Sequence, residues 1–220
     1  MMAHILQYQA EILKALGETG ILIGISTCFA ILVGLPLGTL IYLTRKDGVL
    51  ENRIAYTLGN LYVNVVRSFP FLIFIVAMIP VTRFLLGKSL GTIPASIPLS
   101  FVAVAIFARF VEQSLLDVPQ EIVDTALSMG ASVPQLIMKF LYVEARSGIV
   151  LGLTSSIISF VSYSTVMGAV GGGGIGDFAM RYGYQRFDYL LLYSIVAVMI
   201  VIVQAIQFVG TTIARKIDKR

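Results

Sequence analysis

Five long stretches with no charge, or very few charges, dominate this 220-residue chain. A helix of about 20 apolar residues is long enough to cross the hydrocarbon of a bilayer, and each stretch reaches that length. We therefore predict an all-α integral membrane protein with five membrane-spanning helices. The predicted spans are residues 20–44, 54–82, 93–116, 148–170 and 189–214.

The composition excludes a soluble globular protein. Hydrophobic residues make up 57% of the chain and charged residues 13%, whereas an average soluble domain has about 25% charged residues. The loops are too short to hold a catalytic domain, so residues 1–220 are treated as one transmembrane domain in contact with lipid. The sequence contains no basic patch with interleaved aromatic residues, which is the pattern that would indicate nucleic-acid binding. The single His4 and the single Cys28 suggest neither a metal site nor an intrachain disulfide.

The distribution of basic residues predicts the orientation of the chain in the membrane. Residues 45–53, residues 117–147 and the tail after residue 214 share one side and carry three, two and four Lys or Arg residues. The opposite side carries five. Because basic residues concentrate in cytoplasmic loops, we expect the amino terminus outside and the carboxyl terminus in the cytoplasm. Before the first span, apolar positions within residues 5–17 predict a short helix that lies on the membrane surface.

The cytoplasmic loop 117–147 has the signals of two short helices. Asp117 is placed to cap the first helix, with Pro119 in its first turn. Gly130 is expected to end that helix. Ser132 and Gln135 have the spacing of a capping box for a second helix. The loop is therefore expected to be folded around a Gly-Ala joint, and a surface helix without a partner is the simpler alternative.

The first of these helices contains Asp124, Thr125, Ala126 and Gly130, and Val143 lies in the second. This pattern resembles the signature loop of ABC importer permeases, which has Glu-Ala-Ala-x-x-x-Gly at the first four positions and a proline at the position of Val143. In the family this loop is a coupling helix that docks in a cleft of the ATPase subunit. The resemblance implies a docking surface formed by Glu121, Asp124, Thr125, Ala126, Met129, Gly130 and Ala131.

Further segments extend the resemblance over essentially the whole chain. They resemble the corresponding segments of methionine ABC importer permeases, and they are Arg67-Ser-Phe-Pro-Phe, Ala108-Arg-Phe-Val-Glu112, Tyr163-Ser164, the glycine run 168–176 and Arg181-Tyr-Gly-Tyr184. The resemblance implies a type I importer permease fold in the inner membrane of a bacterium. It also implies a homodimer with two ATPase subunits and an extracytoplasmic substrate-binding protein. This chain would hold no cofactor, and ATP and magnesium would bind to the partner.

Three charged residues lie within or near the predicted spans. Arg67 and Arg109 are the basic residues nearest the membrane interior, and Glu112 follows Arg109 by three positions on the same helix face. We predict that Arg109 and Glu112 form a structural ion pair. The alternative is that Glu112 is the proton or sodium site of a gradient-driven carrier.

The fourth span contains many hydroxyl residues in the absence of charge. Such a stripe indicates either a translocation pathway or hydrogen bonds that hold helices together. We predict a translocation gate at Ser162, Tyr163, Val166 and Met167. The outer glycine run is predicted to form a tight turn that lets helices approach closely, and it consists of Gly171, Gly172, Gly173, Gly174 and Gly176. The same run formally matches a dinucleotide fingerprint, but its expected position after a membrane span does not fit that motif.

Three alternatives to a methionine permease remain at this stage. One is a permease for another amino acid, because nothing in the residues themselves points to methionine. The second is a gradient-driven secondary carrier, for which internal inverted repeats would be expected. A non-transporting scaffold subunit is a third possibility that the folded loop also permits.

Overall fold

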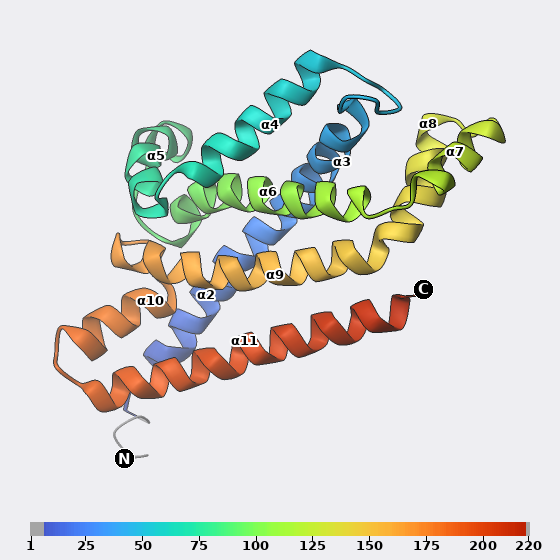
Figure 1. Cartoon of the computed structure of the whole chain (residues 1–220). Coiled ribbons are helices and arrows are strands. Elements are labelled where there is room, and N and C mark those ends of the chain that lie inside the picture. Colours follow the sequence, from blue (N-terminus) through green and yellow to red (C-terminus); the bar gives the residue numbers. More distant parts are fainter. Residues whose placement is uncertain (1–6, 219–220) are drawn as a thin grey trace.

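A computed structural model describes residues 7–218 of the chain (Figure 1). Every regular element in that range is helical. In chain order the elements are α2 (Gln9–Phe29), η1 (Ala30–Gly34), α3 (Leu35–Thr44), α4 (Arg53–Ser68), α5 (Phe71–Leu86), α6 (Thr92–Leu116), α7 (Gln120–Ser128), α8 (Val133–Gln135), η2 (Leu136–Leu141), α9 (Tyr142–Ala169), α10 (Gly174–Phe178), η3 (Ala179–Tyr184) and α11 (Tyr189–Ile217). The elements η1, η2 and η3 are π-helical.

Four helical units are long and apolar enough to cross a membrane, namely residues 9–44, 92–116, 133–169 and 189–217. A fifth crossing exists if α4 and α5 are taken together. The prediction of an all-α membrane protein is therefore confirmed, with four or five candidate spans. Figure 1 places the α3–α4 loop, α7, α8 and the end of α11 at one end of the molecule, whereas α5, α10 and the start of α2 lie at the other.

The first span is longer than predicted, because its helix already covers residues 9–17, where we expected a separate surface helix. The helix runs without interruption from Gln9 through η1 to Thr44. Part of its early apolar surface is packed inside the protein, where Ala15 lies against Ile175 of α10 and Leu191 of α11, whereas Leu13 is 61% exposed. The surface-helix prediction is therefore wrong for residues 9–17, and residues 5 and 6 lie outside the described range.

The second predicted span is broken. Helices α4 and α5 meet at an angle of 113°. The break lies at Phe69, which is extended (φ −72°, ψ 133°), and at Pro70, which is also non-helical (φ −58°, ψ 122°). A proline pushes the preceding residue out of the helical region, so Pro70 is not accommodated within a continuous helix as the prediction of one span over residues 54–82 assumed.

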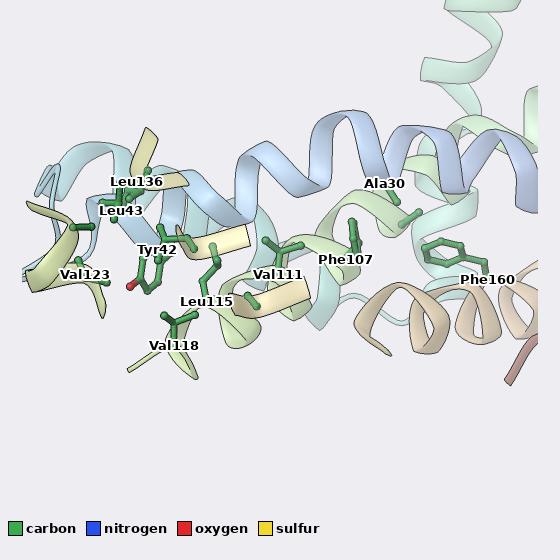
Figure 2. Close-up of a cluster of buried hydrophobic side chains, with 14 residues drawn as sticks. Ala30, Tyr42, Leu43, Phe107, Val111, Leu115, Val118, Val123, Leu136 and Phe160 are labelled. Carbon is green, nitrogen blue, oxygen red and sulfur yellow. The ribbon is translucent and has the colours of Figure 1, made fainter. Parts of the chain in front are cut away.

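Helix α6 forms the centre of the molecule. It packs against α2, α3, α4, α5 and α9, and its Phe107 and Leu115 are almost completely buried. Figure 2 shows the main cluster of buried side chains, which extends from Ala30 and Phe107 to Val123 of α7 and Leu136 of η2. The hydrophobic core of the membrane helices therefore continues without interruption into the loop 117–147.

Candidate functional site

Helix α7 is the central feature of the loop 117–147. It begins at Gln120 with Pro119 at the N-cap position, whereas Asp117 forms the C-cap of α6. The prediction that Asp117 caps the loop helix is therefore wrong, because the proline already sets the chain direction for the first turn. Within α7, Gln120 donates a hydrogen bond to Asp124 Oδ1 (3.0 Å), so the acidic residue of the predicted motif is held by its own helix.

The joint after α7 follows the prediction. Gly130 has a φ of +77°, which a residue with a Cβ adopts only with strain. The amide of Ala131 then donates to the carbonyl of Ala126 (3.0 Å). The Ser132 amide donates to Gln135 Oε1 (2.9 Å), and together they form the predicted capping box.

The second loop helix is not short, however. Residues 133–169 form one helical unit that passes from α8 through η2 into α9. The fourth span therefore begins at the Gly130 joint. Only the short segment 129–132 separates α7 from this helical unit.

The two faces of α7 differ in their surroundings. Val123 and Ala126 are buried in the main core. Five of the seven residues predicted to dock are exposed, and Ala131 is half-buried; the exposed ones are Glu121, Asp124, Thr125, Met129 and Gly130. Met129 is 69% exposed although it is apolar. Thus Ala126 packs the helix against this chain, and the opposite face exposes acidic and apolar groups.

Arg109 connects α4 to α6. Its Nη1 lies 2.5 Å from Glu112 Oε2, and its Nη2 donates to Asn60 Oδ1 (3.1 Å) and to Asn64 Oδ1 (2.8 Å). The predicted pair of Arg109 and Glu112 is therefore present, with two additional acceptors. Because Glu112 is occupied by this bond, the geometry favours the structural alternative over an ion-gradient site.

Arg67 is in a different situation. It lies in the last turn of α4, is exposed, and makes no hydrogen bond or ion pair within residues 7–218. A basic residue at the centre of a membrane helix costs about 2.5 to 3.5 kcal/mol on insertion scales. Such a residue therefore faces water or protein and not lipid.

The four predicted gate residues lie in unlike surroundings. Ser162 is exposed, Tyr163 and Val166 are half-buried, and Met167 is fully buried against Leu22 of α2. The position of Met167 favours packing within the chain over lining a pathway. Hydroxyl groups of this span also bond to their own helix, as when Ser159 donates to the Ser155 carbonyl (3.0 Å).

The glycine run 168–176 forms the predicted tight turn. It joins α9 to α10, and a Cβ on Gly176 would overlap the backbone of Thr165. Gly171, Gly173 and Gly174 have positive φ values, and a Cβ on Gly172 would crowd Met167. Helix α2 caps the turn, because Glu18 accepts from the Gly174 amide and Thr19 from the Ile175 amide (2.8 Å each).

Several residues that organise the site were missed by sequence reasoning. Asn60 and Asn64 had a detectable signal, because they lie one helical turn apart in an apolar stretch and share a face with Arg67. Tyr142 had none. Its hydroxyl lies 2.8 Å from Thr39 Oγ1, a partner 103 residues away, and such a contact depends on the tertiary fold.

Residues 30–220 match the family described as the binding-protein-dependent transport system inner membrane component. The chain belongs to this family and is therefore a multi-pass inner-membrane permease. Among curated relatives, it is 40% identical to the probable D-methionine transport system permease protein MetI of Vibrio cholerae, over 95% of this chain and 93% of that protein. It is 38% identical to the Pasteurella multocida protein of the same description, over 89% of this chain and 90% of that one.

Solved structures give the same result for the fold. The chain superimposes with a TM-score of 0.93 on a structure of the MetNI methionine ABC transporter described as inward facing. The identity is 34%, and the match covers 97% of this chain and 99% of the other. A structure of an amino acid ABC transporter with histidines has a TM-score of 0.80 at 16% identity, which shows a shared fold only.

Proposed function

We propose that this chain is the permease subunit of an ATP-driven importer of methionine. Similarity over nearly the full length to proteins described as D-methionine permeases supports this proposal most strongly. Two copies of the chain would form the translocation pathway and assemble with two ATPase subunits. ATP and magnesium would bind to those subunits, and an extracytoplasmic protein would deliver the amino acid.

The exposed face of α7 is the proposed ATPase contact. Two properties support this role. Its buried face shares the main core with α6, and its joint at Gly130 leads directly into the helix that ends at Ala169. Closure of a partner dimer around α7 would therefore tilt α9, which carries Ser162 and Tyr163 of the proposed gate. Coupling of this kind requires an element with two arrangements that both sites bias.

The proposed orientation places α7 in the cytoplasm and the glycine turn outside. The basic residues of the α3–α4 loop, of the loop 117–147 and of the tail support it, because these segments share one end of the molecule. The glycine turn would then lie where a delivery protein docks.

Affinity purification from the native membrane, through a tag at the carboxyl terminus, tests the assembly. We expect two copies of this chain with two ATPase subunits, by complex mass and partner identification. A chain that purifies only with itself would contradict the proposal and favour a gradient-driven carrier. ATP-dependent uptake into proteoliposomes, compared between methionine and other amino acids, then tests the substrate.

The variant Asp124→Lys tests the docking face. It reverses a charge on the exposed face of α7 without disturbing a buried residue, so we expect an assembled or weakly assembled complex that no longer transports. Glu11→Lys is the matched control, because Glu11 is also exposed but lies at the other end of the molecule, on α2. Normal uptake by Asp124→Lys would exclude a docking role for this face.

A further inference from the structure

A cavity of about 290 Å³ lies at the bend between α4 and α5, with α6 and α9 as its other walls. Small-molecule sites in proteins begin at about 300 Å³, so the cavity has the size of a small metabolite. Its lining includes two guanidinium groups, those of Arg67 and Arg109, together with Ser159 and Tyr163 of the proposed gate helix.

The charges around this cavity do not cancel. Glu112 and two asparagine oxygens occupy the guanidinium of Arg109. The guanidinium of Arg67 has no partner among the residues that the structure describes. The cavity therefore carries one uncompensated positive charge at its edge, and a planar guanidinium binds a carboxylate through two parallel hydrogen bonds.

The rest of the lining is aromatic and aliphatic. The rings of Phe71 and Tyr163 are 4.3 Å apart between centroids, and Phe69, Phe74 and Phe110 also line the cavity. Aromatic walls of this kind suit an unbranched apolar side chain, including one with a polarisable sulfur atom. Gln113 offers an amide oxygen, which is an acceptor for an ammonium group.

We infer that this cavity is a transient binding site for the transported amino acid, in which Arg67 binds the α-carboxylate and the phenylalanine rings contact the side chain. The inference rests on the proposed importer function and adds a location to it. One site then exists in each subunit, beside the proposed gate residue Tyr163. The break between α4 and α5 lies at the wall of the cavity, because Phe69 and Phe71 both line it.

Equilibrium binding of radiolabelled methionine to the purified complex tests the inference. Wild-type complex is compared with Arg67→Gln and Arg67→Lys permease, so that methionine bound to the ATPase subunits cancels in the difference. Loss of a charge-assisted bond predicts an affinity about 10-fold to 100-fold weaker for Arg67→Gln, and Arg67→Lys retains part of the affinity. Methioninamide, which lacks the carboxylate, should compete only weakly for the Arg67-dependent sites.

Arg53→Gln is the control, because it removes an exposed arginine from the first residue of the same helix. At 1.5 Å per residue it lies about 21 Å from Arg67 along α4. The control should bind like wild type. Equal binding by wild type and Arg67→Gln would overturn the inference.

Three other outcomes are also decisive. The Arg67→Gln substitution could also separate the two permease copies while each copy still binds methionine normally. In that case Arg67 pairs with a partner subunit, and the inference is wrong. If the wild-type complex shows no ATP-dependent methionine uptake, the proposed function fails. An importer with intact uptake and no Arg67-dependent binding refutes only the site.

Discussion

The hydroxyl oxygen atoms of Tyr142 and Thr39 lie 2.8 Å apart and join the start of α9 to α3. Thr39 already donates its hydrogen to the Leu35 carbonyl (2.8 Å), so Tyr142 is the donor in this bond. The bond closes the junction between the α7 loop and the membrane helices at a position where α9 leaves the π-helical segment η2.

Removing this donor tests its contribution. We expect Tyr142→Phe to lower the free energy of unfolding by about 1 kcal/mol, which corresponds to a midpoint about 2 to 4 °C lower for a chain of this length. The chain has no tryptophan, so the midpoint is measured by size-exclusion chromatography of a fluorescent fusion after stepwise heating. Tyr56→Phe is the control, because the Tyr56 hydroxyl makes no hydrogen bond within residues 7–218. Equal losses in both variants would contradict the assignment.

Removing one member of the Arg109–Glu112 pair should destabilise the protein far more than removing both. Glu112→Ala leaves a partly buried arginine without its carboxylate, and we expect a loss of about 3 kcal/mol. The double variant Arg109→Met, Glu112→Leu removes both charges and should recover most of that loss, because burying apolar groups here carries no desolvation penalty. The same heating assay measures both. A double variant less stable than Glu112→Ala would mean that Arg109 contributes mainly through Asn60 and Asn64.

Two glycines of very different surroundings form a matched pair. Gly176→Ala places a methyl group against the backbone of Thr165, and backbone atoms cannot move aside cheaply. We expect it to lower the free energy of unfolding by about 1 to 3 kcal/mol. Gly24→Ala lies in α2 with no atom near the added group and should stabilise the helix by up to about 1 kcal/mol. Shifts of the same sign in the heating assay would refute close packing of α9 on α10.

The orientation can be read by thiol labelling. In a Cys28→Ser background, single cysteines replace Ser128 on α7 and Lys88 in the α5–α6 loop, both of which are exposed. A membrane-impermeant maleimide should label the cysteine at position 88 in intact spheroplasts and the one at position 128 only after lysis. The reverse pattern would place α7 outside and exclude an ATPase contact there.

Local patterns predicted much of this architecture. The length of the apolar stretches located residues 92–116 and 189–217 to within three residues of the predicted ends. Gly130 and the Ser132–Gln135 spacing located the joint of the loop, because helix-ending and capping signals act over a few residues.

The predicted and observed helices differ where the structure depends on contacts between distant residues or on the backbone preference of one residue. Residues 9–19 belong to the first helical unit, in which Ala15 packs with residues of α10 and α11, and no local pattern reveals that contact. Pro70 was expected to be tolerated, but its effect on Phe69 breaks the helix. The gate and docking residues remain proposals. Met167 and Ala126 are buried within this chain, which argues against the first as a gate residue and against the second as a docking residue.

The broken second span has a consequence for how the protein is made. Helix α4 has 16 residues and includes Asn60, Asn64 and Arg67, so by itself it is a weak substrate for transfer from the translocation machinery into lipid. Both asparagines bond to Arg109, which is synthesised more than 40 residues later. We therefore expect α4 to wait at the edge of the insertion channel until α6 emerges. The second span then enters the bilayer together with α6, and not before it as its position in the sequence would suggest.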